Sequence, residues 1–192
     1  MIQPVGLRRW MLFVDGENLA IQGEKVGRES GFRIFEGPGF RTGVFLWPPL
    51  RGVECLINSG DWPQEINCIP IRRSYFTAMR GSDPAIAEVT EMIWGAKFQP
   101  HVFKKRNGRS KGVDISLATE FLGNAYKNNF DVAVLLAGDG DYVPMVEEAK
   151  RQGKVVYVAF FQGETSGVSN ELRLASDRFI QIGTTFFDSF GR

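Results

Sequence analysis

Histidine and cysteine are scarce in this sequence, which limits the chemistry open to it. The single histidine, His101, excludes two-histidine acid–base catalysis and multi-histidine metal sites within one chain. It falls in the strand-like run Phe98–Phe103, so a structural or surface role is expected for it rather than a catalytic one. The two cysteines, Cys55 and Cys68, lack zinc-type spacing and have no second pair, which fits a reducing cytoplasm.

Long apolar runs and a strong net charge are also absent. The N-terminal apolar run Trp10–Val14 is stopped by Asp15, which makes it too short for a signal peptide, and no stretch approaches membrane-spanning length. We therefore expect a soluble, cytoplasmic protein with no membrane partner. The net charge of +1 does not indicate a nucleic-acid partner, so any such indication must come from local clusters of charge.

The 192 residues are enough for one domain with a sizeable core, and apolar runs alternate with amphipathic stretches along them. The expected strands are Arg8–Val14, Ile66–Phe76, Phe98–Phe103, Val132–Ala137, Lys154–Phe161 and Arg178–Ile180. The expected helices are Asn18–Val26, Asp83–Trp94, Lys111–Tyr126, Tyr142–Gln152 and Ser169–Ser176. This order predicts a single α/β domain, residues 1–192, with a mainly parallel sheet and helices on both faces.

The region 27–62 differs in character from the rest of the chain. It is rich in glycine, contains Pro38, Pro48 and Pro49, and has scattered aromatic residues without a helical period. We interpret it as a glycine-rich insertion after the first helix, with a hairpin around Phe40–Leu46. Its aromatic side chains are expected to pack on the domain rather than to stack on bases.

Two aspartates follow the most apolar run of the chain. Asp139 and Asp141 come directly after Val132–Ala137, at the kind of strand end where open α/β sheets bind ligands. Asp141 is expected to cap the next helix, with Pro144 in the first turn of that helix and Gly153 after its end. Capping needs one carboxylate, so Asp139 is left without a structural role.

Two further aspartates stand at helix starts. Asp15 follows the first strand, and Asp114 opens a helix in line with its apolar face. Alone, Asp15 is explained as a cap or turn residue and Asp114 as a carboxylate favoured by the helix N-terminus. A cluster of all these acids would repel itself unless it held cations, and oxygen ligands alone favour Mg²⁺ or Mn²⁺. Such ions activate water and stabilise charge on a phosphate, which predicts phosphodiester hydrolysis.

Basic residues cluster just before Asp114. The segment 104–111 has five basic residues in eight, and a solvated loop explains it as well as a phosphate-binding segment does. A second basic pair is expected in a polar turn at the end of the strand Ile66–Phe76. The candidate RNA-binding residues are therefore Arg72, Arg73, Lys104, Lys105, Arg106, Arg109 and Lys111.

Three segments carry a family resemblance: Phe13–Asn18 (FVDGEN), Lys111–Asp114 (KGVD) and Ala137–Pro144 (AGDGDYVP). In order and spacing they resemble the signature segments of NYN domains, the LabA-like branch of the PIN-like nuclease superfamily. The resemblance implies a Rossmann-like sheet whose acidic site binds Mg²⁺ or Mn²⁺ and cleaves RNA. The site residues that it implies are the metal ligands Asp15, Asp114, Asp139 and Asp141, with Asn18 orienting a ligand or the attacking water.

One position departs from the family pattern. Ala137 stands where many relatives have serine before the Gly-Asp pair. The change removes a hydroxyl near the site but no carboxylate, so it affects fine positioning rather than metal binding.

The residues and the resemblance together predict a metal-dependent endoribonuclease that acts on RNA, expected to be single-stranded. The alternative is an RNA-binding or regulatory module with little or no nuclease activity, which predicts salt-sensitive RNA affinity without products. An aspartyl phosphatase, with Asp15 as nucleophile and Glu17 as the second acid, fits the three segments less well. Because PIN-like domains often pair, the resemblance leaves a homodimer open.

Overall fold

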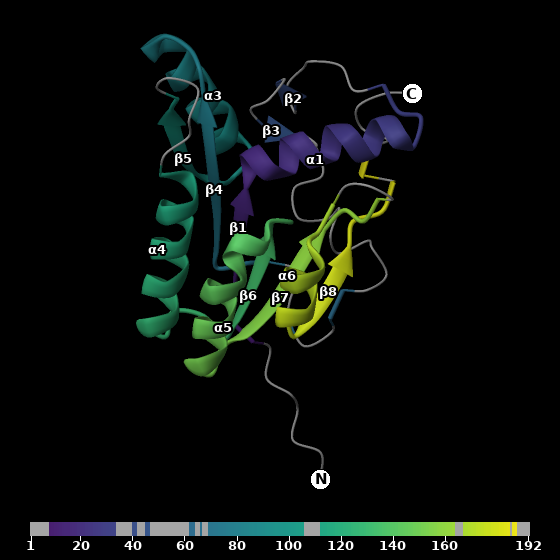
Figure 1. Ribbon diagram of the computed structural model, residues 1–192. Coiled ribbons are helices and arrows are strands. Elements are labelled where there is room, and N and C mark those ends of the chain that lie inside the picture. Colours follow the sequence, from purple (N-terminus) through teal and green to yellow (C-terminus); the bar gives the residue numbers. More distant parts are fainter. Residues whose placement is uncertain are drawn as a thin grey trace.

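The sheet is the centre of the computed structural model, which describes residues 8–33, 40–41, 45–46, 62–63, 66, 69–105, 112–163, 167–184 and 186–187. Six strands lie in the order β5-β4-β1-β6-β7-β8, and every neighbouring pair is parallel (Figure 1). They are β1 (Trp10–Asp15), β4 (Arg72–Met79), β5 (Gln99–Lys104), β6 (Val132–Leu136), β7 (Val155–Phe160) and β8 (Arg178–Gln181). The parallel α/β sheet predicted from the sequence is therefore confirmed.

Helices cover both faces of this sheet (Figure 1). They are α1 (Gly16–Glu29), α3 (Asp83–Gly95), α4 (Val113–Tyr126), α5 (Val143–Arg151) and α6 (Asn170–Ala175), and the 3₁₀ turn η1 (Gly140–Tyr142) leads into α5. In the described part of the chain, no helix is both long enough and apolar enough to cross a membrane.

The two central strands, β1 and β6, separate two hydrophobic cores. Every residue of both strands is buried, as their uninterrupted apolar runs predict. Side chains alternate along a strand, so Leu12 of β1 packs in the core that includes Leu19 of α1 and Val89 of α3. Its neighbour Phe13 belongs to the opposite core, with Phe121 of α4.

Strand β4 differs most from its prediction, which placed it at Ile66–Phe76. The register with β1 begins at Arg72, and the Ile71 N–H just before it already donates to the Trp10 carbonyl (2.9 Å), whereas Pro70 has no N–H to donate to a strand ladder. Arg72 and Arg73 therefore open the strand instead of following it. They lie toward the end of the sheet opposite to the carboxyl ends of the strands.

The region 27–62 is described in part. Helix α1 continues to Glu29, so its end was predicted too early. The backbones of β2 (Phe40–Arg41) and β3 (Phe45–Leu46) pair antiparallel, which confirms the predicted hairpin, and β3 lies beside α1 (Figure 1). Phe32 and Trp62 pack on the domain as predicted, against Phe187 and Trp10 respectively. The other aromatic residues of the region lie outside the described side chains.

Candidate functional site

Asp15 lies at the carboxyl end of β1 and at the start of α1. Its Oδ1 accepts a hydrogen bond from the backbone N–H of Asn18 (3.0 Å), which caps the helix, and its Oδ2 accepts one from the Tyr142 hydroxyl (2.8 Å). Only 4% of the residue is exposed. Burial raises the pKa of Asp15 to about 6, although both hydrogen bonds oppose this effect. A nearby cation would therefore stabilise the ionised form of this carboxyl.

The Tyr142 hydroxyl joins Asp15 to a second aspartate, Asp114, in the first turn of α4. The hydroxyl oxygen lies 2.8 Å from Asp15 Oδ2 and 3.2 Å from Asp114 Oδ1. A hydroxyl has one proton to donate, so the two carboxylates share one donor. Burial is also the main cause that raises the pKa of Asp114. The two acids predicted from distant parts of the sequence thus meet at one hydroxyl.

Asp139 and Asp141 lie in the turn between β6 and α5. Asp139 caps η1, because its Oδ1 accepts a hydrogen bond from the backbone N–H of Asp141 (3.0 Å). The prediction that Asp141 is the cap is therefore wrong: the chain enters α5 through a 3₁₀ turn, and the cap precedes that turn. Both residues are exposed, and after burial their charges contribute to the raised pKa of Asp114. This coupling places them on the same rim as Asp114.

We name Asp15, Asp114, Asp139 and Asp141 together the acidic edge. Among the residues that the structure describes, no three carboxylate, imidazole or thiol groups are placed to hold a metal ion. The ligand atoms nevertheless fit a hard dication, because all of them are oxygens. The fold disfavours the ionised form of two of the acids, and a bound cation would stabilise that form.

Asn18 ties helix α1 to the turn that carries Asp139. Its Oδ1 accepts a hydrogen bond from the backbone N–H of Gly138 (2.8 Å). Gly138 is closely packed, since a Cβ added there would lie 2.5 Å from the Phe160 ring. The oxygen of Asn18 therefore holds the two turns together, and the predicted role of Asn18 in orienting a ligand or water stays a prediction.

Two of the predicted RNA-binding lysines are paired with acids. Lys105, just after β5, forms an ion pair with Glu17 in the first turn of α1, and each side chain is 18% exposed. Lys104 pairs with Asp83 at 2.6 Å. The Glu17 charge contributes to the raised pKa of Asp15, so Lys105 neutralises an acid beside the acidic edge. Lys105 is therefore a partner of the site, a role that the sequence does not indicate.

Of the other predicted basic contacts, the structure describes Arg72 and Arg73, which lie away from the acidic edge. Arg72 and Arg73 pair in register with Met11 and Leu12, which lie four and three positions before Asp15 on the neighbouring strand. Arg106, Arg109 and Lys111 lie outside the described residues. Their predicted contacts with RNA stay predictions.

His101 has the structural surroundings expected for it. Its ring stacks on Phe76, with centroids 4.3 Å apart, and its Nε2 lies 2.9 Å from Glu120 Oε2. The other Glu120 oxygen accepts a hydrogen bond from the Ser74 hydroxyl (2.6 Å). Burial alone would raise the pKa of Glu120, but the interactions with His101 and Ser74 outweigh burial and lower it. Glu120 thus links α4 to β4 and β5.

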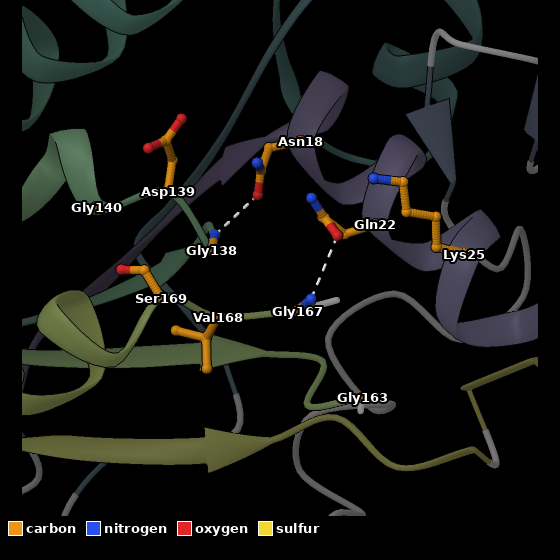
Figure 2. Close-up of a pocket in the computed structure, with 10 residues that line it drawn as sticks. All are labelled: Asn18, Gln22, Lys25, Gly138, Asp139, Gly140, Gly163, Gly167, Val168 and Ser169. Carbon is orange, nitrogen blue, oxygen red and sulfur yellow. Dashed lines mark hydrogen bonds between the residues drawn. The ribbon is translucent and has the colours of Figure 1, made fainter. Parts of the chain in front are cut away.

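A pocket of about 500 Å³ lies next to the acidic edge, between α1 and the segment after β7 (Figure 2). Helix α1 contributes Asn18, Gln22 and Lys25 to its lining. Sequence reasoning missed Gln22 and Lys25. The signal that could have found them is their spacing from Asn18, four and seven residues, which puts all three side chains on one helix face.

A family model of the NYN domain matches residues 9–183. The chain therefore belongs to the NYN domain family, whose members are nuclease-like and fall in the PIN-like superfamily. Among solved structures it is similar to a protein of unknown function from Vibrio parahaemolyticus, with 19% identity, a TM-score of 0.63 and coverage of 100% of both chains. At that identity the similarity supports the fold alone. No curated protein matches the chain.

Proposed function

We propose that this protein is a metal-dependent endoribonuclease that cleaves single-stranded RNA. The observation that carries the proposal is the pair of aspartates, Asp15 and Asp114, held by one tyrosine hydroxyl at the carboxyl edge of a NYN-domain sheet. Burial raises the pKa of both, so a cation between them is favourable. The residues that would hold Mg²⁺ or Mn²⁺ are those of the acidic edge. When bound, the ion supplies positive charge that activates water and stabilises the charge developing on a scissile phosphate.

The protein's own contribution to this reaction is to fix groups in advance. Asp15 is held by hydrogen bonds to both of its oxygens, so little reorganisation is needed during the reaction. The bond from Gly138 N–H to Asn18 fixes the distance between the first strand's turn and the turn of Asp139. The Lys105 ammonium limits repulsion by neutralising Glu17. Asp139 remains exposed, so that an RNA strand can reach it.

The test is cleavage of an end-labelled single-stranded RNA in the presence of Mn²⁺. Asp114→Asn and Asp141→Asn suit it because both residues are exposed overall, although the Asp114 carboxyl is partly desolvated, so the fold should tolerate these changes. We expect each to lower the cleavage rate at least about tenfold, the loss typical of a disturbed metal site. Asp131→Asn is the matched control, since Asp131 lies just before β6, at the other end of that strand. Variants at Asp114 and Asp141 that cleave as fast as the parent would contradict the proposal.

A second candidate, an RNA-binding module without turnover, is favoured by one observation. The Tyr142 hydroxyl already gives Asp15 and Asp114 a hydrogen-bond donor, so the pair is partly satisfied without a cation. This candidate predicts RNA affinity that falls with salt and no products at any Mn²⁺ concentration. The same cleavage assay, run beside a binding assay, separates the two candidates.

A further inference from the structure

The pocket beside the acidic edge presents hydrogen-bond donors that have no partner among the described residues. Asn18, Gln22 and Lys25 rise from one face of α1; Asn18 and Gln22 point across the cavity to Gly138 and Gly167, and the Lys25 side chain extends along the helix toward Gln22 (Figure 2). Its volume of about 500 Å³ lies within the range of roughly 300–1,000 Å³ that is usual for ligand sites. The mechanism proposed above uses neither Gln22 nor Lys25.

The orientation of the two amides follows from their hydrogen bonds. The backbone N–H of Gly138 donates to Asn18 Oδ1 (2.8 Å), and that of Gly167 donates to Gln22 Oε1 (3.3 Å). An amide NH₂ group cannot accept these bonds, so each oxygen is fixed toward the backbone and each NH₂ is left as a donor. Within the described part of the chain, neither NH₂ group nor the Lys25 ammonium has a hydrogen-bond partner.

These donors select an acceptor-rich, negatively charged ligand. Among the described residues that line the pocket there is one carboxylate, Asp139, which belongs to the acidic edge, and one cation, Lys25, seven residues along the helix from Asn18. A rise of about 1.5 Å per residue puts Asn18 and Lys25 roughly 10 Å apart along the axis. An anion at Lys25 is therefore distinct from a phosphate at the acidic edge.

We propose that this pocket binds the nucleotide next to the one at the acidic edge, with its phosphate at Lys25 and its other acceptors at the amides of Asn18 and Gln22. The proposal rests on the proposed function for the identity of the ligand as a single RNA strand. Arginine and lysine contacts to phosphate position a strand without reading its sequence. Lys25 therefore fixes the position of the RNA strand along its own length relative to the acidic edge.

The test measures binding of a fluorescent single-stranded RNA by anisotropy in EDTA, where no metal is present, over a series of salt concentrations. We expect Lys25→Gln to raise the Kd about fivefold at 0.1 M salt and to lower the salt slope by about 0.7, the contribution of one phosphate contact in a single strand. Gln22→Glu keeps an oxygen for the Gly167 N–H but replaces the NH₂ donor by a charge, so we expect a larger rise in Kd. Thermal melting checks that both variants are folded.

Two control variants make the same chemical changes elsewhere. Lys127→Gln removes a charge at the far end of α4, and Gln99→Glu adds one at the first residue of β5. Both should bind RNA within about twofold of the parent. If Lys25→Gln and Gln22→Glu bind like these controls, with an unchanged salt slope, the pocket assignment is overturned.

The same variants keep this inference separate from the ribonuclease proposal. With Mn²⁺, Lys25→Gln should raise KM and leave kcat close to that of the parent, because the lysine binds the strand away from the acids. If the parent binds RNA but yields no product while Lys25→Gln still weakens binding, the ribonuclease proposal fails and the pocket stands. A parent that does not bind RNA overturns both.

Discussion

Replacement of Asp15 by asparagine isolates the cost of burying this carboxylate. Asparagine keeps an oxygen that can accept from the Asn18 N–H, but it has no charge. The pKa of Asp15 is about 6 in the fold, against 3.8 for the ordinary group. That difference corresponds to roughly 3 kcal/mol, at about 1.4 kcal/mol per pH unit. Burial, the largest cause of the difference, is lost on unfolding.

The sign of the effect follows from proton binding. Between pH 3.8 and about 6 the native state keeps a proton on Asp15 that the unfolded chain has already lost. The stability that this proton provides is present at low pH and is lost as the pH rises through about 6. The parent should therefore lose roughly 2 kcal/mol relative to Asp15→Asn between pH 4 and pH 7.5, because the unfolded carboxyl is already partly ionised at pH 4.

The assay is urea unfolding of the parent and of Asp15→Asn in EDTA, at several pH values from 4 to 8. Asp131→Asn serves as a control of opposite sign, because the hydrogen bond from Arg9 lowers the pKa of Asp131. The pH-dependent change in unfolding free energy that Asp131→Asn causes should stay below about 1 kcal/mol, since an exposed ion pair is screened by solvent. Mn²⁺ at about 100 times its Kd should raise the free energy of unfolding of the parent by about 2.7 kcal/mol, and that of Asp15→Asn by less.

One result would refute this reasoning. If the difference in unfolding free energy between the parent and Asp15→Asn is the same at pH 4 and at pH 8, Asp15 ionises as easily in the fold as in the unfolded chain. The argument that burial makes a cation favourable at this carboxylate would then fail.

Two further predictions concern the supports of the site. Lys105→Met leaves Glu17 without its cation and should lower the free energy of unfolding in urea by about 2–4 kcal/mol. The double variant Lys105→Met/Glu17→Gln should recover most of this loss. If it recovers none, the ion pair does not stabilise the fold. Gly138→Ala puts a Cβ 2.5 Å from the Phe160 ring and should cost about 1–3 kcal/mol. Gly123→Ala, whose Cβ meets nothing within 4 Å in α4, should instead gain about 0.5–1 kcal/mol, and equal effects of the two changes would contradict the packing argument.

The sequence predicts the central strands well and β4 poorly, for a physical reason. β1 and β6 are continuous apolar runs that are buried on both faces, so their pattern alone marks them. The stretch around Pro70 has strand-forming residues on both sides, and local preference cannot decide which of them joins the sheet. The register with β1, which starts at Arg72, makes that choice.

Site residues can be predicted from the sequence where the local turn identifies them. Interactions between residues that are distant in the sequence cannot be predicted in this way. The strand ends and helix starts reveal the aspartates of the acidic edge. The ion pair of Glu17 and Lys105 joins residues 88 positions apart, so no local pattern announces it. The exchange of roles between Asp139 and Asp141 depends on one 3₁₀ turn, whose presence a helix-capping argument does not foresee.

Helix α1 joins the acid at its start to the donors on its later turns, and this has a consequence for variation in the family. The distance from Asp15 to Lys25 is set by the constant rise of a helix and by no loop. Variation in the region that follows Glu29 therefore leaves the spacing between Asp15 and Lys25 unchanged.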